Sequence, residues 1–168
     1  MIRDGETGAS ARVPREAVAI VTAGSVGTGR EVAGALAGWG WAIVVVYLEH
    51  QPMAEAAVAE ILAAHGKIVA VRADLADDLD VQRLFAESTA AFAGVDVVVH
   101  TTTDSASLLY RHAAGHVRSR GAIVTVPGAG PVPPEIARQL RAREISIGSA
   151  PEGELLAFLD VWRRQDGR

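Results

Sequence analysis

The chain of 168 residues contains no cysteine and only one lysine, Lys67. The absence of cysteine excludes a disulfide framework and any thiolate metal site, and it fits a cytoplasmic protein. No apolar run approaches the roughly 18 residues that a membrane-spanning helix needs. The formal net charge of −4 argues against nucleic acid or an anionic membrane as a partner, because both need a clustered positive surface. We therefore expect a cytoplasmic protein with neither of these partners.

Residues 1–16 are polar and contain glycine, and they lack the apolar segment of a secretion signal. This composition predicts a flexible N-terminal arm. The rest of the chain has no linker that would divide it, and 49% of all residues are hydrophobic while 21% are charged. A chain of 17.5 kDa with this balance is large enough to bury a core. The sequence therefore predicts a single domain over residues 17–168.

The most informative segment is a glycine-rich stretch that follows the first apolar strand. Residues 18–21 lead into the turn TAGSVGTG, residues 22–29, and a helix is expected to begin near Thr28. Glycines let a phosphate approach the backbone closely, and the N-terminus of a helix favours an anion. The turn therefore predicts a nucleotide site, and an empty strand-to-helix turn is the alternative. A P-loop is excluded, because Arg30 and Glu31 stand where it needs a lysine and a hydroxyl residue.

Apolar strands alternate with helices along the whole chain. Strands are expected at residues 18–21, 41–47, 67–72, 95–100, 121–126 and 145–149. Helices are expected from residue 28, at 52–65, at 79–92, from 101–105 to about 120, at 135–143 and at 154–164. Continuous apolar strands are typical of parallel sheets that are covered on both faces. The sequence thus predicts an α/β fold, a doubly wound parallel sheet of about six strands in the order 3-2-1-4-5-6 with helices on both faces.

Three segments, in the right order along residues 18–126, resemble the short-chain dehydrogenase/reductase family. The glycine turn is similar to the family's T-G-x-x-x-G-x-G, with Ala23 in place of the first glycine. Asp74 followed by Leu75 resembles the family's Asp-Val or Asp-Leu after strand three, where the acid meets the adenine ring. Residues 95–99 resemble the strand before the family's Asn-Asn-Ala-Gly. The resemblance implies a shortened Rossmann core that binds NAD or NADP.

The resemblance also implies which residues contact a dinucleotide or a small nucleotide. They are Thr22, Gly24, Ser25, Gly27, Thr28, Gly29, Tyr47, Asp74, Leu75, His100 and Thr101. The family selects NAD with an acid at the end of strand two and NADP with nearby basic residues, but Tyr47 and Leu48 occupy that end here. The preference between NAD and NADP is therefore open. Arg30 could reach a phosphate and Glu49 a ribose hydroxyl, and an exposed surface position is the alternative for both.

The family's catalytic pair is not found in its usual arrangement. Hydride transfer in the family needs a tyrosine acid whose pKa is lowered by a lysine four residues later. Four residues after Tyr47 and Tyr110 stand Gln51 and Ala114, and Lys67 lies at the start of the third expected strand. The segment PGAG follows strand five, where the family's catalytic serine is expected. We therefore expect the usual hydride-transfer mechanism to be absent.

The densest polar cluster of the chain is residues 100–105, HTTTDS, where the family has Asn-Asn-Ala-Gly. At the carboxyl end of strand four, this cluster would border the crevice in which such sheets bind ligands. His100 and Thr102 are therefore candidates to bind a ligand or to replace the missing acid. The alternative is that Thr103 or Asp104 caps the next helix and that His100 bonds a neighbouring carbonyl group.

Two further groups of residues suggest a metal site and a dimer. His112 and His116 lie one helical turn apart, a spacing that can hold zinc, but no third ligand is evident nearby. We expect a half-exposed helix face and no metal site. Family members pair through the helices beside strands four and five, so Leu108, Leu109 and Ala113 could form a dimer face.

These observations lead to three hypotheses of different classes. The first is an NAD(P)-binding protein without the family's tyrosine and lysine chemistry, acting as a cofactor sensor or as a partner subunit. The second is an active NAD(P)H-dependent oxidoreductase with a substituted acid group. The third is a structural scaffold that binds no nucleotide.

Overall fold

The computed structural model describes residues 16–165, so all of the predicted arm except Glu16 lies outside the described residues. Six strands are present: β1 (Val18–Thr22), β2 (Ala42–Tyr47), β3 (Lys67–Arg72), β4 (Val95–His100), β5 (Val117–Thr125) and β6 (Ser146–Ser149). The helices are α1 (Gly27–Gly38), α2 (Gln51–Ala63), α3 (Asp78–Phe92), α4 (Ser107–His116), α5 (Pro134–Ala142) and α6 (Leu155–Gln165), with a short 3₁₀ helix η1 (Glu152–Glu154) before α6.

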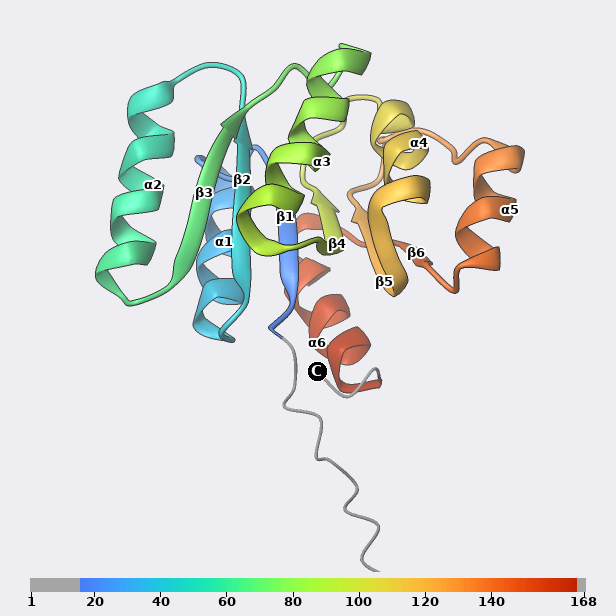
Figure 1. Ribbon diagram of the computed structural model, residues 1–168. Helices are drawn as coiled ribbons and strands as arrows, with labels where there is room; N and C mark the ends of the chain where they lie inside the picture. Colours follow the sequence, from blue (N-terminus) through green and yellow to red (C-terminus); the bar gives the residue numbers. More distant parts are fainter. Residues whose placement is uncertain (1–15, 166–168) are drawn as a thin grey trace, which may run out of the picture.

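The predicted sheet is confirmed. All neighbouring strands pair in parallel, in the order β3-β2-β1-β4-β5-β6 (Figure 1). The strand β1 lies near the centre, between β2 and β4, and all five of its residues are buried. The direction of winding reverses between β1 and β4. In sheets of this kind a ligand binds beyond the carboxyl ends of the strands at such a reversal.

Helices cover both faces of the sheet with apolar side chains. The helices α1 and α6 cover one face of the sheet. They share a buried cluster with it through Val32, Leu36, Leu155 and Leu159. The helices α3, α4 and α5 cover the opposite face, where Phe85 of α3 is fully buried. The sheet is therefore the middle layer of three layers (Figure 1).

The expected helix from 101–105 to about 120 is wrong in its length. The helix α4 is shorter, and Val117 already pairs with Val95 as the first residue of β5. Arg118 Nη1 donates to Oδ2 of the fully buried Asp96 at 2.9 Å, which holds this segment at the sheet. The pairing crosses 22 residues of sequence, so the hydrophobic periodicity of the segment does not reveal it.

The glycine turn between β1 and α1 depends on one close contact. A Cβ atom at Gly29 would lie 2.3 Å from the carbonyl oxygen of Ala23, so no larger residue fits there without moving the backbone. Gly27 has a φ angle of +48° and Ala23 one of +47°. Ala23 therefore adopts the left-handed conformation for which the family's glycine is suited, and the substitution strains the backbone.

A buried polar network joins the ends of β1 and β4. Thr22 Oγ1 accepts the backbone N–H of Thr101 at 3.0 Å, and Thr101 Oγ1 donates to Thr22 O at 2.7 Å. His100 Nε2 lies 2.8 Å from Asp104 O, and a carbonyl oxygen only accepts, so Nε2 carries the proton. Nδ1 then accepts from the Thr22 hydroxyl at 3.0 Å. Burial lowers the pKa of His100, which favours this neutral form.

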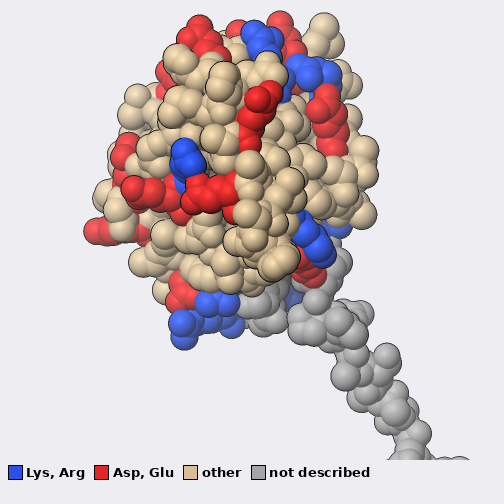
Figure 2. Space-filling view, turned by 90° about the vertical axis from the view of Figure 1, so that its left-hand side faces the viewer, with Lys and Arg blue, Asp and Glu red and all other residues tan. Residues whose placement is uncertain are grey.

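The surface carries charges of both signs. On the face shown in Figure 2, the described Lys and Arg side chains are scattered among Asp and Glu and do not form one basic patch. Within residues 16–165, no helix combines the length and the apolar composition that crossing a bilayer requires.

Two glycines of α1 provide a matched test of the close contact. We expect Gly29→Ala to lower the free energy of unfolding by about 1–3 kcal/mol, because the new methyl group overlaps the carbonyl of Ala23. Gly34→Ala meets no atom within 4 Å and should raise it by up to about 1 kcal/mol through helix propensity. Urea unfolding measures both changes, and an equal effect of the two substitutions would contradict the close contact.

The buried neutral His100 predicts a loss of stability in acid. The unfolded chain takes up a proton on this imidazole below about pH 6.5, while the lowered pKa keeps the folded side chain neutral. The free energy of unfolding should therefore fall between pH 7.5 and pH 5.5, by up to about 1.4 kcal/mol from this group. In His100→Gln this part of the fall should vanish, whereas the exposed His65→Gln should keep it. Identical pH dependence in both variants would contradict the assignment.

Candidate functional site

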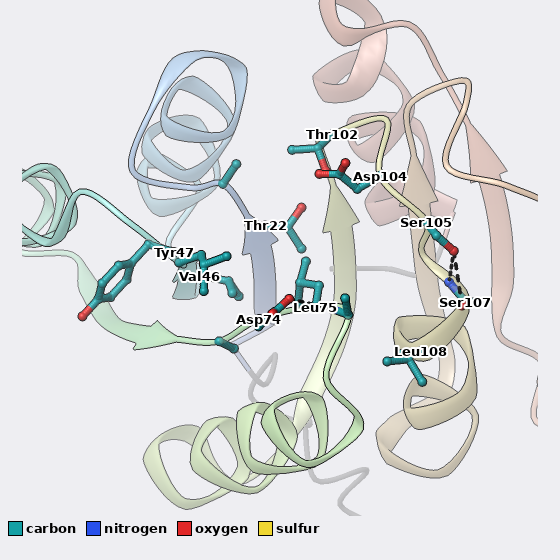
Figure 3. A pocket seen from close by; sticks show the side chains of 14 residues that line it. Thr22, Val46, Tyr47, Asp74, Leu75, Thr102, Asp104, Ser105, Ser107 and Leu108 are labelled. Carbon is teal, nitrogen blue, oxygen red and sulfur yellow. Dashed lines mark hydrogen bonds between the residues drawn. The ribbon is translucent and has the colours of Figure 1, made fainter.

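A cavity of about 770 Å³ lies at the carboxyl ends of β1, β2, β3 and β4, where the winding of the sheet reverses. Figure 3 shows Thr22 and Leu75 near its centre, with Thr102 and Asp104 beyond the end of β4. Its lining residues are Thr22, Ala23, Val46, Tyr47, Leu48, Ala73, Asp74, Leu75, Ala76, Thr102, Asp104, Ser105, Ser107 and Leu108. The cavity is therefore formed by strand ends and the segments that follow them.

The structure brings five of the expected site residues together at this cavity: Thr22, Tyr47, Asp74, Leu75 and Thr102. The ring of Tyr47 points away from Thr22 and Leu75 (Figure 3). The turn residues Gly24, Ser25, Gly27, Thr28 and Gly29 follow directly after Ala23 and are not among the lining residues.

His100 and Thr101 lie behind the cavity wall, and their side chains hold β4 to β1. Both ring nitrogens of His100 have partners inside the protein, and its side chain is fully buried. The alternative that His100 bonds a neighbouring carbonyl group agrees with this geometry, and the carbonyl is that of Asp104. The expected helix cap is wrong, because the N-cap of α4 is Ala106 and not Thr103 or Asp104.

Sequence reasoning missed the part of the cavity that α4 contributes. Ser105, Ser107 and Leu108 line it, and Ser105 Oγ donates to Ser107 Oγ at 3.2 Å (Figure 3). Ser105 precedes α4 and belongs to the polar cluster that the sequence predicts beside the crevice, so only Ser107 and Leu108 were missed. Leu108 carried no such signal, because at the sequence level it is an ordinary apolar residue of an amphipathic helix.

The cavity is lined by acidic but not by basic side chains. Asp74 and Asp104 line it, and Lys, Arg and His are absent from the described residues of its wall. Asp74 Oδ1 accepts the backbone N–H of Ala76 at 2.9 Å, which fixes the carboxylate at the start of the loop after β3. Asp80 accepts the Asp74 N–H at 2.8 Å, and this bond together with Arg83 lowers the pKa of Asp80. The loop after β3 is thus held by carboxylates at both of its ends.

The N-terminus of α1 adjoins the cavity on its turn side. Its N-cap residue, Val26, provides no side-chain acceptor, and the first turn of α1 contains no acidic residue. The acceptor at this end comes from a distant segment: Thr28 Oγ1 donates to Glu152 Oε2 of η1 at 2.7 Å. Arg30, the basic residue nearest to the turn in sequence, pairs with Glu60 of α2. An anion at this end would therefore be held by backbone N–H groups and the helix dipole.

The tyrosine and lysine side chains do not meet at the cavity. Lys67 is the first residue of β3, at the amino end of the strand and away from the cavity, and it pairs with Glu16 at 2.6 Å. Tyr110 is buried in α4, where its hydroxyl donates to Gly130 O at 3.5 Å. The strand β3 has six residues, so Lys67 lies roughly 16 Å from the end of β3 that borders the cavity.

Both histidines of α4 make contacts with other side chains of the chain. His112 Nε2 lies 2.9 Å from Asp78 Oδ1, and the ring of His116 stacks on Phe85. No group of three or more His, Cys, Asp or Glu side chains in residues 16–165 is placed to hold a metal ion. The suggested dimer face is wrong for two of its three residues, because Leu109 and Ala113 are buried in the chain's own core.

Comparison with known proteins agrees with this architecture. Residues 17–126 match the family model described as short chain dehydrogenase. A 3-oxoacyl-[acyl-carrier-protein] reductase from Synechocystis is 40% identical over 83 residues, which cover 49% of this chain and 34% of that protein. This match spans about a third of the length of that reductase.

Solved structures resemble this protein over most of its chain. A dehydrogenase/reductase from Sinorhizobium meliloti superposes with a TM-score of 0.68 at 25% identity, covering 80% of this chain and 71% of the other. A short chain dehydrogenase from Burkholderia cenocepacia, solved in complex with NADP, has a TM-score of 0.66 at 23% identity, with 79% and 72% covered. The family model covers well over half of the chain, from the glycine turn to the end of β5. This protein therefore belongs to the short chain dehydrogenase family.

Proposed function

We propose that this chain binds a nicotinamide dinucleotide at the glycine turn and the adjoining cavity, without the family's tyrosine and lysine hydride transfer. In this proposal it acts as a cofactor sensor or as a partner subunit. Thr22, Gly24, Ser25, Gly27, Thr28, Gly29, Tyr47, Asp74, Leu75 and Thr102 form the proposed cofactor site. His100 and Thr101 support it from behind.

The observation that carries the proposal is the position of the cavity. It opens where the winding reverses, beside the turn whose residue Gly29 allows no side chain. The adjoining end of α1 offers backbone N–H groups to a diphosphate, while Leu75 and Leu48 offer apolar surface to a base. The related Burkholderia cenocepacia enzyme was solved in complex with NADP, which supports a dinucleotide as the ligand.

The positions of Lys67 and Tyr110 support the absence of the usual chemistry. In the family mechanism the lysine must lie beside both the tyrosine and the nicotinamide ribose. Lys67 lies at the amino end of β3, away from the cavity, and Tyr110 is buried in α4. His100 is buried, neutral and bonded at both ring nitrogens, which argues against it as a substitute for the tyrosine acid.

The charge of the cavity favours NAD over NADP. Asp74 and Asp104 line it, and the nearby Arg30 is bound to Glu60. A 2′-phosphate would therefore enter an acidic wall without a basic partner. NAD has hydroxyl groups at the same ribose and avoids this repulsion.

Two exposed leucines provide a matched test of the site. Leu48 lines the cavity at the end of β2 and is 42% exposed, while Leu62 of α2 lies outside the cavity and is 52% exposed. We expect Leu48→Arg to raise the affinity for NADP relative to that for NAD several-fold, because the guanidinium can pair with the 2′-phosphate that NAD lacks. Leu62→Arg should change neither affinity. Isothermal titration calorimetry with both dinucleotides measures these effects.

Each result of that titration has a distinct meaning. Equal gains in both variants would show only a nonspecific effect of positive charge and would contradict the placement of the ribose at β2. If neither dinucleotide bound to the wild type or to either variant, the proposed function itself would be wrong.

A further inference from the structure

The N-terminus of α1 already carries an anionic partner from within the chain. Glu152 Oε2 accepts the hydroxyl of Thr28, the second residue of α1, at 2.7 Å. The two residues are 124 positions apart in sequence. The contact therefore depends on the tertiary fold and joins the glycine turn to the segment that follows β6.

The fold holds Glu152 at this place. Glu152 begins η1, and Leu155 directly after η1 is fully buried in the cluster that also contains Val32 and Leu36 of α1. Glu154 N donates to Pro151 O at 2.8 Å and closes the short turn. The backbone at Glu152 is thus anchored beside α1, while the Glu152 side chain itself stays exposed to solvent.

The electrostatics of the helix end explain why a carboxylate lies there. Val26 offers no side-chain cap and the first turn of α1 has no acid, so the positive end of the helix dipole lacks an anionic partner from its own segment. The carboxylate of Glu152 supplies one. A dinucleotide diphosphate bound to the same helix end would be repelled by this negative charge.

We propose that Glu152 is an internal competitor for the phosphate site of α1, which must swing away from Thr28 before a diphosphate can bind. The inference rests on the proposed dinucleotide site and adds a control to it. Glu152 lowers the affinity for ligands that carry phosphate and has no such effect on the nucleoside alone. Any event that draws Glu152 away from Thr28 then opens the site.

The test compares two glutamates of the same short helix. Glu152→Gln and Glu154→Gln remove the same charge from η1, but the competing carboxylate belongs to Glu152. By calorimetry on the full chain, Glu152→Gln should bind NAD at least fivefold more tightly than the wild type, and Glu154→Gln less than twofold more tightly. The affinity for adenosine should stay the same in all three proteins.

The other outcomes separate this inference from the proposed function. If all three proteins bind NAD equally, Glu152 is not a competitor and the dinucleotide site stands. Weaker binding by Glu152→Gln would also overturn the inference, because the carboxylate would then assist the ligand. If none of the three binds NAD or adenosine, both the inference and the proposed function are wrong.

Discussion

The contact between the Thr22 side chain and the start of the segment after β4 determines the geometry of the site. This hydroxyl accepts the Thr101 N–H and donates to His100, so it joins the two strands between which the winding of the sheet reverses. Together with the Thr101 hydroxyl, which donates to Thr22 O, it fixes the loops after the two strands relative to each other. Because Thr22 is also the last residue of β1, the same side chain locates the glycine turn relative to the polar segment after His100.

The site divides into two parts with different chemistry. The cavity between the strand ends is apolar and acidic, through Leu48, Leu75, Asp74 and Asp104, and in the proposed function it takes the base and its ribose. The end of α1 suits a diphosphate, and Glu152 already occupies a position beside it. In the proposed function these groups bind a dinucleotide. The single lysine, Lys67, lies at the amino end of β3, where it forms an ion pair with Glu16.

The sequence predicted the sheet well because its strands are continuous runs of apolar residues, a pattern that depends on burial alone. The prediction failed where contacts between residues far apart in the sequence decide the structure. Arg118 reaches Asp96 and draws Val117 into β5, so an expected helix is shortened. The contact of Thr28 with Glu152 and the cavity wall from Leu108 likewise join segments far apart in sequence. The turn was recognisable because its glycines are needed for local steric reasons. At Gly29, for example, a Cβ atom would overlap the carbonyl oxygen of Ala23.

The central claim is that a dinucleotide lies across the turn and the cavity. Amide ¹H–¹⁵N spectra of the labelled protein, titrated with NAD, test it residue by residue. We expect saturable shifts at Gly27, Leu48, Asp74 and Ser105, while Lys67 at the amino end of β3 stays unchanged. Spectra without shifts at millimolar NAD, or shifts confined to residues away from the cavity, would contradict the account.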